Sequence, residues 1–289
     1  MKVVVIGGTG LLGQAIGAEW HGDDLVLAGS KDVDIRSYQQ VNKFLERHGP
    51  DWVVLAAAFP DVDGCERNPE LADEVNHRGA IHVAEACREL AARLMFISTD
   101  YVFDGSKGSP YEVDDPVCPQ SVYARSKAAA EAAVRRILPG SCIARVSWLF
   151  GPEKKCFANI ALGWAESGQT VRAVVDQRGI PNYNHDLARA LAALVRAGAE
   201  GTVHVTNAGE TSWYEFAREL VAAAESNVPV EPVTLEALGR PARRPHYSAL
   251  SDASLRRYGI HLRHWRDALP DYLARRTHMR GRLAVHPVG

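Results

Sequence analysis

The sequence predicts an α/β protein built on a doubly wound parallel sheet. Short β-branched runs alternate with longer helical stretches from residue 1 to about residue 150, as expected for strands joined by crossover helices. The first of these runs is followed at once by the glycine-rich turn Gly7-Gly8-Thr9-Gly10-Leu11-Leu12-Gly13. Such a turn is typical of the first strand-to-helix connection in a nucleotide-binding sheet of the Rossmann type.

Residues 1–150 are expected to form the dinucleotide-binding domain. Strands are predicted near residues 2–6, 24–28, 51–56, 93–98 and 141–146. Helices are predicted between them at residues 11–20, 37–47, 71–91 and 121–137, where apolar and charged residues recur with helical spacing. The first strand is almost entirely β-branched, which indicates a strand covered on both faces.

Residues 151–276 are expected to form a smaller C-terminal α/β portion that binds substrate and packs against the first domain. Helices are predicted near 157–167, 185–197 and 212–224, and strands at 171–175 and 202–206. The segment 227–245 contains Pro229, Pro232, Pro241 and Pro245, so it is expected to be extended or looped. Residues 277–289 have no apolar periodicity and are expected to be a frayed tail.

Composition excludes several classes of partner. With 46% hydrophobic and 24% charged residues and a net charge of −2, the 289-residue chain has no basic field to hold nucleic acid or an anionic membrane. No stretch approaches about 18 uninterrupted apolar residues, and no leader is recognised, so a cytoplasmic location is expected. The five cysteines lack the close spacing of zinc or redox motifs and are expected to be reduced: Cys65, Cys87, Cys118, Cys142 and Cys156.

The glycine turn predicts a dinucleotide site. Glycine lets the backbone turn tightly and approach a pyrophosphate, and the free N–H groups at a helix start favour an anion. The residues expected to contact the cofactor here are Gly7, Gly10, Leu11, Leu12 and Gly13.

A tyrosine and a lysine on one predicted helix suggest the chemistry. Tyr123 and Lys127 are four residues apart and share a helix face. A nearby ammonium is expected to lower the pKa of the phenol, which then protonates the oxygen that gains charge during hydride addition to a ketone. Ser98 and Thr99 end a predicted central strand, and strand alternation lets only one of the two hydroxyls reach the site.

The sequence resembles the extended short-chain dehydrogenase/reductases, and within them the dTDP-4-dehydrorhamnose reductase group. The glycine turn and the Tyr123 to Lys127 segment carry the wider resemblance. More particular to the group are Ser98-Thr99-Asp100-Tyr101-Val102-Phe103-Asp104-Gly105 and Arg145-Val146-Ser147-Trp148-Leu149-Phe150-Gly151. Asp176-Gln177 with Pro181, and Arg244-Pro245, also carry the resemblance.

The resemblance implies roles for individual residues. Thr99 is the hydroxyl donor, Tyr123 the acid, and Lys127 both the pKa modulator and a ligand of the nicotinamide ribose. The cofactor is lined by Ala56, Ala57 and Ala58, and Asp34 with Ile35 resembles the pair that contacts adenine. Trp148 packs on the sugar or base of the substrate, or belongs to the core.

Three further assignments come from residue chemistry. Asp100 either caps a turn or orients the site hydroxyls. Arg178, in a predicted loop, is the candidate contact for a substrate diphosphate because a guanidinium suits phosphate oxygens. His185 and Asp186 are interpreted as a helix-capping site.

The residues after the second strand favour NADPH. Ser30 and Lys31 stand where an acidic residue would accept from the ribose of NAD, and they suit an additional phosphate. NADH stays possible, because Asp32 or Asp34 could approach the ribose.

The predicted function is therefore NAD(P)H-dependent reduction of the 4-keto group of a nucleotide-activated deoxysugar. Two alternatives are a non-catalytic, cofactor-binding regulatory subunit, since the resemblance extends to a partner of methionine adenosyltransferase, and a nucleotide-sugar epimerase or decarboxylase. Some bacterial members of the family place a glutamate of a metal-bridged dimer contact where this sequence has Ala15. We accordingly predict no metal, and a monomer or homodimer.

Overall fold

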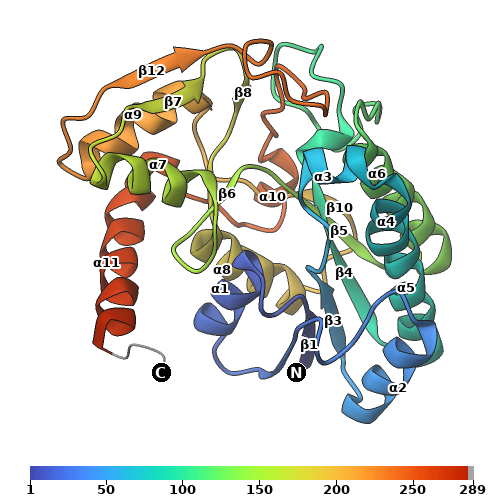
Figure 1. The fold of residues 1–289 in the computed structure, drawn as a ribbon. Coiled ribbons are helices and arrows are strands. Elements are labelled where there is room, and N and C mark those ends of the chain that lie inside the picture. Colours follow the sequence, from blue (N-terminus) through green and yellow to red (C-terminus); the bar gives the residue numbers. More distant parts are fainter. Residues whose placement is uncertain (286–289) are drawn as a thin grey trace.

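The computed structural model describes residues 1–285 and has a parallel sheet between two helical layers (Figure 1). In this part of the chain the main sheet has six strands in the order β10-β5-β4-β3-β1-β2, and all neighbours are parallel. The strands are β1 Lys2–Ile6, β2 Asp24–Ala28, β3 Trp52–Leu55, β4 Arg93–Thr99, β5 Cys142–Val146 and β10 Gly201–His204. The predicted α/β class is confirmed.

The two faces of the sheet build two separate cores. Alternation along β1 sends Val3 and Val5 to one core and Val4 and Ile6 to the other. The first core is closed by α1 (Leu11–Glu19) and α8 (Asn184–Arg196), and the second by α2 (Tyr38–His48), α5 (Gly79–Glu89) and α6 (Val122–Ile137). Because both faces of β1 are covered, its continuous β-branched sequence is explained.

The main sheet uses chain from both sides of residue 150. The strand predicted at 202–206 is β10, which pairs with β5 from Gly201 opposite Cys142 to His204 opposite Arg145. Helix α8, which precedes it, packs on α1 beneath the glycine turn. The predicted division at residue 150 therefore falls within one continuous sheet.

The remaining part lies at the carboxyl end of the sheet. It contains α7 (Phe157–Glu166), α9 (Trp213–Ala223) and β7 (Val171–Val174), with β12 (Val230–Val233) parallel to β7. Its core combines small aliphatic residues with the buried aromatic residues Phe150, Tyr183, Phe216, Trp265 and Tyr272. The sequence did not predict the two-residue strands, because so few residues show no alternation: β6 Leu149–Phe150 with β9 Asn182–Tyr183, and β8 Arg178–Gly179 with β11 Thr211–Ser212.

The C-terminal expectation of a frayed tail is wrong for residues 277–285. Helix α11 runs from Leu269 to Val285 after η3 (Trp265–Ala268) and α10 (Ala253–Arg256). Tyr272 donates to Asn159 at 2.7 Å, and Arg276 pairs with Glu166, so the first turns of the helix are fixed to α7. The later turns lack apolar periodicity but are rich in strong helix formers such as arginine, leucine and alanine. Residues 286–289 of the predicted tail lie outside the described residues.

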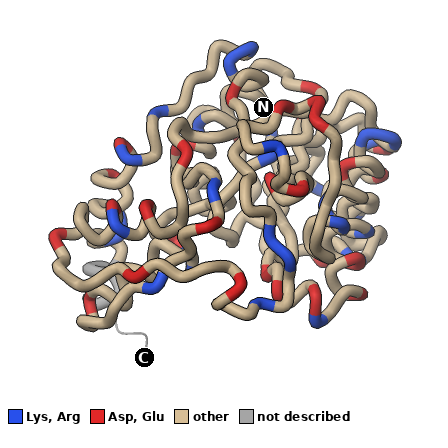
Figure 2. Tube along the Cα trace, turned by 90° about the horizontal axis from the view of Figure 1, so that it is seen from above, with Lys and Arg blue, Asp and Glu red and all other residues tan. Residues whose placement is uncertain are grey.

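The helix predicted at 71–91 contains a π-helical segment. It is divided into α4 (Pro69–Ala72), the π-helical η1 (Asp73–Arg78) and α5, and it follows α3 (Val62–Arg67). Such segments often lie at functional sites. None of the helices in residues 1–285 is long and apolar enough to cross a membrane, and in the view of Figure 2 acidic and basic residues are interspersed.

Candidate active site

The glycine turn forms a backbone cradle that side chains would fill. Gly7 has φ of +98°, and the Gly10 N–H donates to its carbonyl at 2.9 Å. A Cβ on Gly13 would lie 2.2 Å from the Gly7 oxygen, which is impossible without a backbone shift. No side chain caps the first N–H groups of α1. The cradle thus fits a dinucleotide pyrophosphate, which those N–H groups would bind.

The cradle opens into a cavity of about 730 Å³ at the carboxyl ends of β1, β4 and β5. Predicted site residues that line it are Gly7, Gly10, Leu11, Leu12, Gly13, Ser30, Ala56, Ala57, Ala58, Thr99, Asp100, Tyr123 and Trp148. The structure therefore places the glycine turn, the strand-end hydroxyl and the tyrosine around one space, as a ligand site of an open α/β sheet requires.

Thr99 and Tyr123 form the polar centre of this cavity. Thr99 ends β4 and donates to Asp100 Oδ1 at 3.1 Å, and its hydroxyl is near enough to the Tyr123 phenol to lower the pKa of that phenol. Tyr123 lies in the first turn of α6, whose N-terminus is capped by Ser121. Of the two candidate hydroxyls, Thr99 is thus the one that meets Tyr123.

Lys127 is not among the main causes that shift the pKa of Tyr123. Burial raises the pKa of the phenol, and the neighbouring Thr99 hydroxyl opposes that shift only in part. The Lys127 ammonium donates to the Ile97 carbonyl at 2.7 Å and lies 3.9 Å from the centre of the Phe96 ring. Burial in these surroundings lowers the pKa of Lys127 to about 7. The shared helix face is present, but the expected direction of the phenol shift is wrong.

Asp100 is an acid buried at the edge of the cavity. It begins the short 3₁₀ helix η2 (Asp100–Val102), and burial raises its pKa to about 7. One of its oxygens accepts from Thr99, whereas Oδ2 has no partner among the described residues. The geometry matches the interpretation that Asp100 orients the site hydroxyl.

Trp148 forms an aromatic wall with a residue that the sequence did not single out. Its ring stacks on Trp213 at 3.8 Å between centroids and 10° between planes, and both line the cavity. Trp213 donates to Gln177 at 3.1 Å, and Gln177 donates to the Tyr101 hydroxyl at 3.1 Å. The sequence did not identify Trp213 as a site residue, because it begins α9, far along the chain, and belongs to no recognisable binding motif.

Arg178 lies outside the cavity lining. It belongs to β8, where its backbone N–H donates to His246 and its guanidinium is 3.6 Å from Glu215. The structure does not bring it to Thr99 and Tyr123, because the predicted loop is a short strand paired with β11.

Of the residues predicted to contact the adenosine part of the cofactor, only some line the cavity. Ser30 lines the cavity, whereas Lys31 is exposed beside it. The Asp32 carboxylate accepts from the Gly29 N–H at 2.7 Å. Asp34 is held by Arg36, which lowers the pKa of its carboxyl, and the buried Ile35 packs against Gly79.

The interpretation of His185 and Asp186 as a capping site is wrong. Tyr183 precedes α8, and no side chain caps that helix. His185 is instead buried between two carboxylates, with Nδ1 2.8 Å from Glu19 and Nε2 2.5 Å from Glu153. Asp186 binds Arg263 and Asn207. Sequence alone did not reveal these partners, because Glu19, Glu153, Asn207 and Arg263 come from four distant segments.

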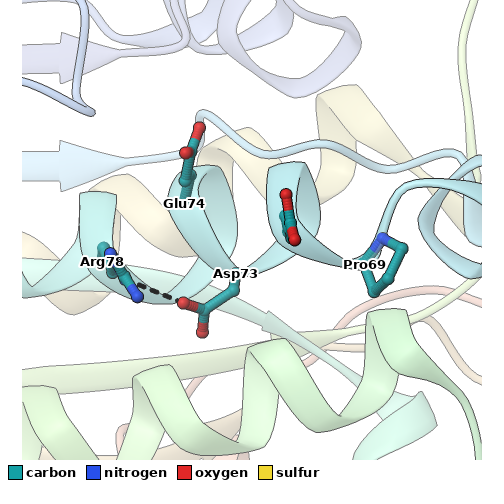
Figure 3. Close-up of a pocket in the computed structure, with 5 residues that line it drawn as sticks. Pro69, Asp73, Glu74 and Arg78 are labelled. Carbon is teal, nitrogen blue, oxygen red and sulfur yellow. Dashed lines mark hydrogen bonds and ion pairs between the residues drawn. The ribbon is translucent and has the colours of Figure 1, made fainter.

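The π-helical segment braces the cavity wall. Asn76 in η1 is buried, accepts from the Phe59 N–H at 2.7 Å and donates to Ser126 on α6 at 3.1 Å. A separate hollow of about 480 Å³ lies on the outer side of this segment, where Arg78 pairs with Asp73 (Figure 3). That hollow contains none of the predicted site residues.

Comparisons with known proteins agree with the geometry of the site. The family described as RmlD substrate binding domain matches residues 1–278. A dTDP-4-dehydrorhamnose reductase of Streptomyces griseus is 39% identical, over 93% of this chain and 91% of the relative. The spore coat polysaccharide biosynthesis protein SpsK of Bacillus subtilis is 37% identical, over 96% and 98%.

Solved structures are similar over nearly the whole chain. A dTDP-4-dehydrorhamnose reductase of Clostridium acetobutylicum has a TM-score of 0.92 at 34% identity, covering 95% of this chain and 99% of that one. The enzyme of the same name from Bacillus anthracis, in complex with NADP, has a TM-score of 0.92 at 32% identity with the same coverage. This chain, with its Rossmann-like sheet, belongs to the RmlD substrate binding domain family.

Proposed function

We propose that the protein is an NADPH-dependent reductase that converts the 4-keto group of a dTDP-activated deoxysugar to an alcohol. The observation that carries this proposal is the presence of Thr99 and Tyr123 in one cavity with the glycine cradle. A site for a dinucleotide next to a protonated phenol is what reduction of a carbonyl requires.

The relatives support the substrate and the cofactor. Relatives from Streptomyces griseus and Streptomyces niveus are named dTDP-4-dehydrorhamnose reductase and dTDP-4-keto-6-deoxy-D-glucose reductase, and the Bacillus anthracis structure contains NADP. In this chain, the Asp32 carboxylate accepts a hydrogen bond from the Gly29 backbone N–H, and Asp34 is paired with Arg36. Neither carboxylate is free beside Ser30, which favours the additional phosphate of NADPH.

The reaction divides between the cofactor and the chain. Reduced nicotinamide, when bound, supplies a hydride to the carbonyl carbon. Tyr123 keeps its proton at neutral pH because burial raises its pKa, so that proton is available to the carbonyl oxygen. The Thr99 hydroxyl donates to Asp100 Oδ1 in this structure, and it can rotate to donate to the carbonyl oxygen instead. Trp213, supported from behind by the stacked Trp148, forms an apolar wall that suits one face of a sugar ring.

Steady-state turnover tests the proposal. A panel of dTDP-4-keto-6-deoxysugars is offered with NADPH or NADH, cofactor consumption is followed, and products are identified by mass spectrometry. We expect stoichiometric NADPH consumption and a product with two more hydrogen atoms. Tight cofactor binding without any consumption would favour a regulatory subunit, retained cofactor recycled within each turnover would favour an epimerase, and a tenfold preference for NADH would reverse the cofactor assignment.

The assembly and the cellular location are further parts of this proposal. A monomer or homodimer that does not depend on metal is proposed because Ala15, at the position of the family's glutamate, is buried in the core. Light scattering with and without chelator measures this directly. A cytoplasmic location is proposed from composition, and fractionation of cells tests it.

A further inference from the structure

The cavity contains one cation that the described contacts leave free. A nucleotide-sugar substrate carries a diphosphate, which proteins bind with lysine, arginine and helix N-termini. Among the lining residues within 1–285, Lys155 is the sole lysine or arginine. Lys127 is engaged with Ile97, and Arg178 with Glu215. Neither of these two cations lines the cavity.

The loop that carries Lys155 is fixed on both sides of it. Glu153 accepts from Asn184 at 2.7 Å and lies 2.5 Å from His185, whose ring is buried. Asn159 donates to the carbonyls of Gly151 at 2.8 Å and Lys154 at 2.7 Å. The backbone at Lys155 is therefore held in place before a ligand arrives, which lowers the entropic cost of binding.

The Lys155 side chain itself is exposed. In the described part of the chain it forms no ion pair and no side-chain hydrogen bond. The next residues, Cys156 and Phe157, also line the cavity, and the Phe157 ring meets Trp213 edge to face at 4.8 Å. Lys155 thus adjoins the aromatic wall, whereas the glycine cradle supplies its own N–H groups for the cofactor.

We infer that Lys155 binds the diphosphate of the nucleotide-sugar substrate and gives the cavity its selectivity for nucleoside diphosphates over unphosphorylated sugars. This inference rests on the proposed function and names the cation that the reductase uses to hold its substrate. The fixed loop positions the Lys155 ammonium for the diphosphate, and the neighbouring aromatic wall packs against an apolar face of the same substrate.

Lys154 provides a matched control, because it is a neighbouring exposed lysine that does not line the cavity. Lys155→Met, Lys155→Arg and Lys154→Met are compared by titration calorimetry with dTDP and with thymidine, in the presence of NADP. We expect Lys155→Met to weaken dTDP binding about tenfold or more, as loss of a charge-assisted hydrogen bond does. Thymidine and NADPH affinities should be unchanged, Lys155→Arg should retain most of the affinity, and Lys154→Met should match the wild type.

Steady-state kinetics give a second measurement. Lys155→Met should raise KM for the nucleotide sugar by a similar factor, with kcat within about twofold, because a contact to the diphosphate is the same in the bound substrate and in the transition state. Equal dTDP affinity in the two methionine variants would overturn the inference. Weaker NADPH binding with dTDP affinity intact would reassign Lys155 to the cofactor. A wild-type protein that neither binds dTDP nor reduces any dTDP-sugar would instead refute the proposed function.

Discussion

Trp148 stacks on Trp213 from a backbone conformation that only the surrounding structure can hold. Its φ is +38°, a region that costs a non-glycine residue about 1–3 kcal/mol. Gly179 lies directly beneath the indole, and a Cβ there would come 2.6 Å from Trp148 Cε2. Both features place the ring where Trp213 can cover it, in the lining of the cavity.

Replacement of Trp213 by alanine should weaken substrate binding. The change removes one of the two stacked rings and the hydrogen bond to Gln177. A stacked aromatic pair contributes about 0.5–1.5 kcal/mol, so we expect KM for the nucleotide sugar to rise about two- to tenfold. NADPH affinity should not change. The control is Trp164→Ala, at an exposed tryptophan of α7; equal effects of the two substitutions would contradict a role for the stack.

Tyr123→Phe should abolish turnover while the cofactor still binds. Loss of a general acid typically slows a reaction by about 10²–10⁴-fold, and the phenyl ring preserves the packing on Tyr101. NADPH affinity, measured by fluorescence titration, should match the wild type. Tyr101→Phe serves as the comparison in the same cavity and should retain more activity. A Tyr123→Phe enzyme with most of its rate would show that another group donates the proton.

The buried Lys127 should make stability depend on pH. Its pKa is about 7 in the folded protein against 10.5 ordinarily, so between these values the unfolded state binds the additional proton. Stability from this group therefore rises with pH across that range and is constant below about pH 7. The free energy of unfolding of the wild type minus that of Lys127→Met should increase from pH 7 to pH 10 in urea titrations. Lys154→Met should give a flat difference, and a flat difference for Lys127→Met would contradict the lowered pKa.

Glu131→Gln should destabilise the fold strongly. Glu131 on α6 accepts from Arg145 on β5 at 2.9 and 2.8 Å, and both side chains are buried. Removal of one partner leaves an unpaired buried charge, at a cost of about 3–5 kcal/mol. The double variant Glu131→Met with Arg145→Met removes both charges and should be less destabilised. Denaturant unfolding measures both, with Asp252→Asn, in the exposed pair with Arg256, as a control expected to change by less than about 1 kcal/mol.

Local sequence signals were sufficient to predict the sheet, the glycine turn and the positions of Thr99 and Tyr123 beside one cavity. The β-branched run before Gly7, and the helix start that carries Tyr123, each lie within one segment. The relation between Tyr123 and Lys127 could not be read in the same way, because the direction of a pKa shift depends on burial and on which carbonyl the ammonium meets. Helical spacing placed the two residues together but did not reveal the Ile97 oxygen.

Contacts between segments that are distant in the sequence could not be predicted from local patterns. Lys155 follows Lys154 in a loop without a motif, and only the fold shows that one faces the cavity and the other does not. His185 resembled a capping residue because Glu19 and Glu153 are remote in sequence. The first turns of α11 are fixed by the pairing of Arg276 with Glu166 on α7, which no local periodicity can indicate.

The position of β10 makes the two parts of the chain inseparable. A fragment that stops at residue 150 would lose β10 from the edge of β5 and α8 from the back of α1. Its exposed strand edge and bare apolar surface would invite aggregation. A chimaera of two related enzymes that exchanges the C-terminal segments would therefore have to keep residues 184–204 with the nucleotide-binding half. These residues complete the sheet and one of its helical layers, although they follow residue 150 in the sequence.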